Sequence, residues 1–258
     1  MSRKATDKRC VFCGRTDQKM SKEHLWPEWV RKLLPDALAN QKVVYSMADS
    51  HLGEIRKIEL RLFDLTVKDV CEPCNTGWMH RIEDAMKSVT EHLLRGGQRE
   101  LHAGGQTTIA AWAVLKLLVM SRVMPRRLVL DADYEAIFET GQELEPPSCV
   151  RVYTAGAAWS KGQAPSGFFR VNGIEEDLET ADEDQIDGYL GTISVLDLVV
   201  QVFRVYGDDS ASEDFVHSPG LAPSVRRIWP VTPSFVWPPG SLLTTNGIKA
   251  LAGGEFAA

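Results

Sequence analysis

The sequence predicts an α+β fold with a four-cysteine zinc site near its N-terminus, followed by helices and a mixed α/β C-terminal region. Three observations support this prediction. Two Cys-x-x-Cys motifs bracket the segment 10–74, apolar residues recur at helical spacing from about residue 76 to residue 140, and short strand-like runs dominate after residue 148. A chain of 258 residues is long enough to bury a large core, in one domain or in two.

The composition excludes several classes of protein. The chain is 44% hydrophobic and 25% charged, with a formal net charge of −6, and these values argue against collagen-like, mostly disordered and coiled-coil proteins. The first ten residues lack the apolar stretch of a secretory signal, so the five cysteines indicate a reducing compartment. We therefore expect a cytoplasmic protein that does not bind a membrane.

The first hundred residues are predicted to contain short helices and strands. A short helix is expected at 27–34, after a polar knuckle around the first Cys-x-x-Cys motif. Alternating apolar residues predict strands at 41–47 and within 54–70, where a slip in the spacing predicts a turn or bulge. After the second motif, a helix capped by Asn75 or Thr76 is expected to run to the pair Gly96-Gly97.

The later part of the chain is predicted to hold two helices and then a set of strands. The helix at 107–123 is the most apolar, but it contains Lys116 and Arg122, so we predict a buried helix and not a membrane span. The second helix is expected at 132–140. Strands are expected at 150–154, 167–171, 191–195 and 198–206. The proline-rich segment 227–240 is predicted to form an extended edge.

The charges are distributed unevenly along the chain. Residues 1–100 contain 18 Lys and Arg against 15 Asp and Glu, whereas residues 101–258 contain 11 against 20. Any contact with a polyanion is therefore expected in the N-terminal part. We divide the chain into domains at 1–100 and 101–258. The acidic segment 175–187 is expected to be a solvated loop or a cover over a nucleic-acid-binding face.

The two Cys-x-x-Cys motifs are the strongest indication of chemistry. Two residues between the thiolates allow both sulfurs to enter one tetrahedral site, and the four side chains of Cys10, Cys13, Cys71 and Cys74 complete a structural zinc site. The alternatives are four ordinary buried cysteines or a redox pair. The fifth cysteine, Cys149, has no nucleophile motif around it and is expected to be an unreactive thiol.

A Glu-His dipeptide with a nearby proline lies between the two cysteine motifs. Glu23 can hold a hard divalent cation, while the neutral imidazole of His24 can accept a proton from water. A metal-assisted hydrolysis needs these two functions side by side. The position of the dipeptide between the motifs, with Asn75 directly after the last cysteine, makes the pattern more specific than the dipeptide alone.

This pattern resembles the HNH endonuclease family in its zinc-stabilised branch. The matching residues are Cys10, Cys13, Glu23, His24, Pro27, Cys71, Cys74 and Asn75. The resemblance covers about residues 8–95 and implies a ββα-metal core in the 1–100 domain. It also implies that His24 activates water for attack on phosphorus, and that Glu23 and Asn75 hold a catalytic Mg²⁺ or Mn²⁺ ion. The implied substrate is DNA, with RNA as an alternative, and the implied host is a bacterium or a phage.

Several residues depart from the family pattern. Thr66 stands where the family has its middle Asn, and Glu23 replaces the more usual Asp. Trp78 replaces a basic residue that contacts phosphate, while His80 is an alternative ligand or phosphate contact. These departures leave a second interpretation open, in which the chain is a catalytically degenerate, zinc-stabilised nucleic-acid-binding module. A third is metal-dependent chemistry on another substrate. In each case the C-terminal region is expected to select the target or to bind a partner, either a second copy or another protein.

Overall fold

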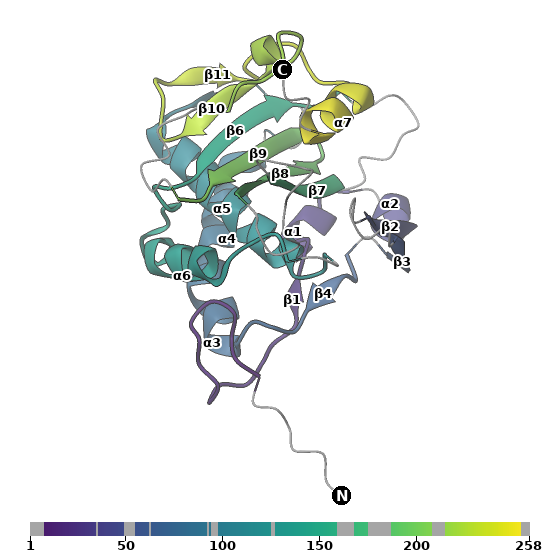
Figure 1. Ribbon diagram of the computed structural model, residues 1–258. Coiled ribbons are helices and arrows are strands. Elements are labelled where there is room, and N and C mark those ends of the chain that lie inside the picture. Colours follow the sequence, from purple (N-terminus) through teal and green to yellow (C-terminus); the bar gives the residue numbers. More distant parts are fainter. Residues whose placement is uncertain are drawn as a thin grey trace, which may run out of the picture.

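The computed structural model describes most of the chain (Figure 1). The described residues are 8–34, 36–48, 55–61, 63–91, 93, 98–124, 127–158, 168–174, 187–207 and 215–253. Of the acidic segment 175–187, all but Asp187 lies outside these residues. The architecture is α+β, as predicted: helices lie beneath a five-stranded sheet, and a lobe containing the two cysteine motifs projects from the helical side.

A long apolar helix forms the centre of the molecule. Helix α5 (Ala103–Ser121) is buried at every position from Ile109 to Ser121. It is long and apolar enough to cross a membrane, but 72% of its most apolar window is buried inside the protein. A helix that is apolar on all sides is typical of a core surrounded by protein. The predicted buried helix at 107–123 is therefore confirmed, and it begins four residues earlier than expected.

An antiparallel sheet covers one side of this helix in the strand order β10-β6-β9-β8-β7. Its strands are β6 (Arg151–Gly156), β7 (Phe168–Ile174), β8 (Gly188–Val195), β9 (Leu198–Val205) and β10 (Arg226–Trp229). Helix α7 (Thr245–Gly253), which the sequence analysis missed, packs on the other face. The side chains of adjacent residues in β9 therefore lie on opposite faces of the sheet. Val199 packs in the cluster around α7, and Val200 packs in the main core.

The segment before α5 consists of short elements. These are β1 (Glu23–His24), α1 (Glu28–Arg31), α2 (Asp36–Ala39), β2 (Lys42–Ala48), β3 (Ile55–Arg61), β4 (Thr66–Val67), α3 (Glu72–Cys74), a π-helical turn (Asn75–Met79) and α4 (His80–Thr90). The predicted interruption within 54–70 is confirmed, because β3 and β4 are separate strands in different sheets. Strands β2 and β3 form a hairpin, whereas β4 returns to pair with β1.

One hydrophobic core joins both sides of the predicted domain boundary at residue 100. Its buried members include Phe12 and Trp26 from the first part, and Trp112, Ile193 and Trp237 from the second. Trp26, Trp78 and Trp112 are buried in this core, and Trp29 is half-buried against it.

Two further elements link distant parts of the chain. Strand β5 (Arg99–Leu101) pairs with β11 (Phe235–Trp237), and β11 lies in the segment predicted to be extended. Helix α6 (Asp131–Thr140), at its predicted place, packs against α5.

Candidate zinc centre and histidine site

The four cysteines of the two motifs converge on one point. All four Sγ atoms lie within 4.8 Å of one another, with Cys10 Sγ 3.9 Å from Cys74 Sγ and Cys13 Sγ 3.6 Å from Cys71 Sγ. A tetrahedral zinc ion with Zn–S bonds near 2.3 Å places its sulfurs about 3.8 Å apart. The donor set and the spacing therefore fit a zinc ion bound by four thiolates. These distances are too long for disulfides, and all four cysteines are free.

Backbone hydrogen bonds hold the two Cys-x-x-Cys knuckles in place. The amide of Gly14 donates to the carbonyl of Cys10 at 3.0 Å, and a positive φ of 69° closes this turn, a conformation that favours glycine. Cys71 and Cys74 lie at the first turn of α3, where the amide of Cys71 donates to Cys10 Sγ at 3.4 Å. One hydrogen bond within the first knuckle and one between the two knuckles thus position the sulfurs near one another.

The thiols influence one another's ionisation. The contact with Cys74 lowers the pKa of Cys10 to about 4, and the same contact, with burial, raises the pKa of Cys74 above its ordinary range. Burial raises the pKa of Cys71 to about 11. Thiolates this close together repel, so ionisation of Cys10 opposes that of Cys71 and Cys74. A divalent cation with a preference for sulfur removes this penalty.

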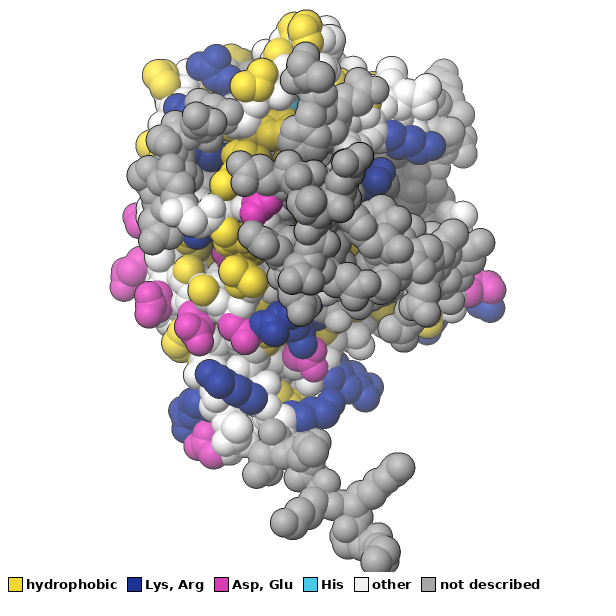
Figure 2. Space-filling model, viewed as in Figure 1, with side chains coloured by type: hydrophobic (Ala, Val, Ile, Leu, Met, Phe, Trp, Pro, Cys, Tyr) yellow, Lys and Arg dark blue, Asp and Glu magenta, His cyan; other side chains and the backbone are white. Residues whose placement is uncertain are grey.

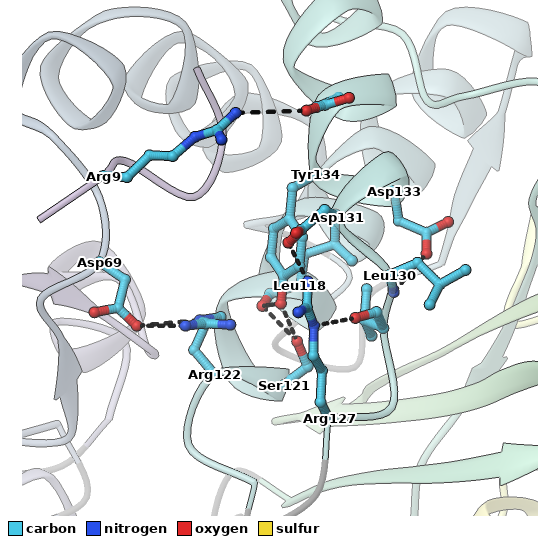
Figure 3. A network of polar contacts seen from close by, with 12 residues as sticks. Arg9, Asp69, Leu118, Ser121, Arg122, Arg127, Leu130, Asp131, Asp133 and Tyr134 are labelled. Carbon is cyan, nitrogen blue, oxygen red and sulfur yellow. Dashed lines mark hydrogen bonds and ion pairs between the residues drawn. The ribbon is translucent and has the colours of Figure 1, made fainter. Parts of the chain in front are cut away.

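Aromatic and ionic contacts fix the cysteine lobe to the helices. Phe12, between the cysteines of the first motif, packs edge-on against Trp78 and Tyr134 at centroid distances of 5.3 and 5.5 Å. Arg122, at the end of α5, donates through Nη2 and Nε to Asp69 Oδ2 at 2.9 and 3.1 Å (Figure 3). Trp78 is therefore a core residue of this lobe.

Strands β1 and β4 form an antiparallel ladder directly above the cysteine lobe. Glu23 pairs with Val67 and His24 with Thr66, so the threonine at the position of the family's middle Asn lies opposite the histidine. The side chains alternate along the ladder: Glu23 and Val67 are buried, whereas His24 is exposed. The chain enters a helix five residues after β4, through α3 and the π-helical turn, so two strands and a helix surround this region.

His24 is held in one orientation. Its Nδ1 lies 3.0 Å from the carbonyl oxygen of Phe63. A carbonyl oxygen only accepts hydrogen bonds, so Nδ1 carries the proton in the neutral ring. The lone pair is then on Nε2 of an exposed side chain. An imidazole in this tautomer can accept a proton from a water molecule in front of the strand.

The carboxylate of Glu23 forms an ion pair in the core. Its Oε1 lies 2.7 Å from Nζ of Lys116 on α5, which also contacts the carboxylate of Glu83 and the carbonyl of His24. Burial alone would lower the pKa of Lys116, but the two carboxylates outweigh it and the pKa lies above its ordinary value. Since Glu23 faces the core and His24 faces solvent, the structure does not support the prediction that Glu23 holds a cation in front of His24.

Asn75 lies against the beginning of β1. Its Nδ2 donates to Ser21 Oγ at 3.0 Å and lies 3.5 Å from the carbonyl of Lys22, and this arrangement leaves Oδ1 as the remaining acceptor. His80 instead pairs with Asp84 on its own helix, with Nε2 3.3 Å from Oδ2. In the described part of the chain, the four cysteines are the one group of three or more His, Cys, Asp and Glu side chains placed to bind a metal ion. A second cluster for Mg²⁺ or Mn²⁺ is not formed there by such side chains.

Two groups that fix Glu23 and His24 in place were not predicted from the sequence: the ammonium group of Lys116 and the carbonyl oxygen of Phe63. Lys116 interrupts an otherwise apolar helix, and this charge is the feature of the sequence that indicates a buried partner. The Phe63 carbonyl could not be found from side-chain patterns, because it is a backbone atom.

Comparisons with known proteins give no independent assignment: no protein-family model, no curated protein and no solved structure matches the chain.

Proposed function

We propose that the protein is a metal-dependent endonuclease of the HNH type that hydrolyses phosphodiester bonds in DNA, with RNA as the alternative substrate. The observation that carries this proposal is the fixed tautomer of His24, whose Nδ1 is bound to the Phe63 carbonyl and whose Nε2 is directed to an exposed face. Two further features support it: the antiparallel β1–β4 ladder followed by a helix, and the cysteine cluster beside it.

In the proposed reaction, His24 Nε2 accepts a proton from a water molecule, and the water oxygen attacks phosphorus while the bond to the 3′-oxygen breaks. A divalent cation would neutralise charge on the phosphate oxygens. Asn75 Oδ1 is the candidate protein ligand for that cation, and Mg²⁺ commonly completes its shell with water and substrate phosphates. In this proposal Glu23 acts through Lys116 as a positioning residue. Zinc has a structural role.

The proposal is tested by incubating the full chain with supercoiled plasmid and with RNA, in Mg²⁺, Mn²⁺ or neither. We expect metal-dependent nicking that His24→Ala abolishes and that His102→Ala leaves unchanged, because His102 is exposed and lies on the entry to α5. Cleavage that survives His24→Ala, with purified protein and a constant zinc content, contradicts the role of His24.

A second candidate function is a non-catalytic, zinc-stabilised nucleic-acid-binding module. The contact between Glu23 and Lys116 favours it, because that contact removes a carboxylate from the expected cation site. In that case the protein binds DNA or RNA without cleavage in any of the metals, and His24→Ala has no effect on the substrate.

A further inference from the structure

Two lysines stand at the same end of the β1–β4 ladder. Lys22 directly precedes β1 and Lys68 directly follows β4, and the strands are antiparallel, so both residues lie at the end nearer to the cysteine lobe. Both are exposed, as is His24, whereas the intervening Glu23 and Val67 are buried. By the alternation of side chains along a strand, the lysines share the face of His24 and Thr66.

The charges of these two lysines are not balanced within the described part of the protein. Neither makes an ion pair there, although neighbouring cations of the same lobe do: Arg15 pairs with Asp17, Lys19 with Glu72 and Arg122 with Asp69. Lys22 and Lys68 are directly adjacent in sequence to the paired residues Glu23 and Val67, so their two like charges lie near each other and repel. A bound anion offsets this repulsion. Asp69, next to Lys68, is already bound to Arg122.

The surroundings favour an anion. Lys and Arg side chains gather on the cysteine lobe, beneath the rest of the molecule (Figure 2). Asn75 lies at the same end of the ladder, with Nδ2 3.5 Å from the carbonyl of Lys22. Lys22 and His24 are two residues apart on an extended strand, which separates them by about 7 Å.

We propose that Lys22 and Lys68 bind a phosphate group of a nucleic-acid backbone, beside the phosphodiester that faces His24. This assignment rests on the proposed function, since it names how the same site holds its substrate. The ammonium groups act as point charges, and they contribute affinity without base specificity.

The test measures binding separately from cleavage. A labelled 20-base-pair DNA duplex is titrated with the full chain carrying His24→Ala, without added divalent cation, between 50 and 200 mM salt. In this background, Lys22→Ala/Lys68→Ala is compared with Lys32→Ala/Lys87→Ala. The second pair removes the same net charge and two other exposed lysines that make no ion pair with any residue the structure describes. We expect about tenfold weaker binding for the first pair, and a salt dependence smaller by about two counterions.

The outcomes distinguish this inference from the proposed function. Equal affinity and equal salt dependence of the two double variants overturn the phosphate site, even where the wild-type protein cleaves plasmid. Absence of binding by the His24→Ala chain also overturns it. Selective loss of binding with Lys22→Ala/Lys68→Ala, together with restoration by Lys22→Arg/Lys68→Arg, supports the site whether or not the wild-type protein is a nuclease.

Discussion

The Nζ atom of Lys116 lies 2.7 Å from Oε1 of Glu23, which connects the central helix α5 to a strand that precedes it by 93 residues. The lysine side chain has no exposed surface, and the Glu23 side chain has 9%. Glu83 on α4 provides the second carboxylate, and the carbonyl of His24 accepts a further bond from the same ammonium group. A single buried cation thus joins three elements behind the exposed histidine.

Removal of this cation is expected to destabilise the fold strongly. Lys116→Met leaves the buried carboxylate of Glu23 and the half-buried carboxylate of Glu83 without their partner. Loss of one partner of a buried ion pair typically costs about 3–5 kcal/mol. Urea denaturation of the purified variant measures the loss in the free energy of unfolding. Adding Glu23→Gln and Glu83→Gln should restore part of it, because the uncompensated charges are then removed. A stability loss below about 1 kcal/mol for Lys116→Met would contradict the buried ion pair.

Glu23 and Asn75 are expected to differ in their effects on metal dependence. Glu23→Gln should lower stability but leave the Mg²⁺ concentration for half-maximal cleavage unchanged, because its carboxylate faces Lys116. Asn75→Ala should raise that concentration, since Oδ1 of Asn75 is the candidate ligand. Plasmid-nicking rates across a Mg²⁺ series separate the two variants. If both variants raised the Mg²⁺ concentration for half-maximal cleavage equally, Glu23 would be a ligand of the cation after all.

The cysteine cluster is expected to hold one zinc ion per chain, with an affinity that rises with pH. Burial raises the pKa of Cys71 to about 11, so this thiol is protonated at neutral pH without metal and must release its proton on binding. Elemental analysis gives the stoichiometry, and transfer of zinc to a chromogenic chelator should be faster at pH 5 than at pH 8. Cys71→Ser should lose zinc and stability. Cys149→Ser, outside the cluster, should retain both.

Close packing between the sheet and α5 predicts opposite effects for two glycine substitutions. In Gly191→Ala, the added Cβ would collide with Leu117 of α5, and overpacking of this kind costs about 1–3 kcal/mol. Gly104, in the first turn of α5, has nothing within 4 Å of the corresponding position. Gly104→Ala should therefore raise stability by up to about 1 kcal/mol. Thermal unfolding of both variants measures the contrast, and equal melting temperatures would contradict it.

His217 is expected to weaken the fold in mild acid. Burial lowers the pKa of His217 to about 4, against about 6.5 in an unfolded chain. The unfolded state therefore binds the proton first, and stability falls as the pH decreases from 6.5 toward 4. The loss should be about 1 kcal/mol between pH 7 and pH 5, after allowance for partial exposure.

The variant His217→Phe isolates this contribution. It keeps a ring against Tyr153 and Phe215, which pack edge-on against His217 at 4.8 and 4.9 Å, but it does not titrate. Its stability should depend less steeply on pH between 7 and 5 than that of the wild-type protein. An unchanged slope in urea-denaturation experiments would exclude His217 as the titrating group.

Periodic patterns of apolar residues were sufficient to predict many of the helices and strands. The apolar run at 107–123 and the alternating runs after residue 148 identified α5 and four strands of the sheet, because burial on a regular element leaves a periodic trace in the sequence. Helix α7 was not predicted, because its sequence, TNGIKALAG, is short and includes glycine at two positions. The expected helix start at Asn75 was also wrong, since helical structure begins earlier, with α3 at Glu72, and Gly77 interrupts it before α4. The Asn75 side chain donates to Ser21 and does not cap a helix.

The site was predictable only where its members share a local spacing. The cysteine cluster follows from two Cys-x-x-Cys motifs, and its convergence is confirmed. The partner of Glu23 was not predictable, because periodicity places Lys116 in the core but does not identify which carboxylate lies against it. His24 is exposed while Glu23 is buried because the two residues form a short β-strand. A strand of two residues cannot be distinguished from a loop by its sequence pattern, so this difference was not predictable.

The position of Lys116 in the chain has a consequence for synthesis. Because a polypeptide is made from its N-terminus, both cysteine motifs, β1 and Glu83 exist before any residue of α5. A nascent chain that ends before α5 has two carboxylates without their cation and a core without its central helix. Strand β1, which carries His24, therefore reaches its final surroundings only after the ribosome has synthesised α5. The N-terminal part of the chain thus cannot complete its folding before α5 is made.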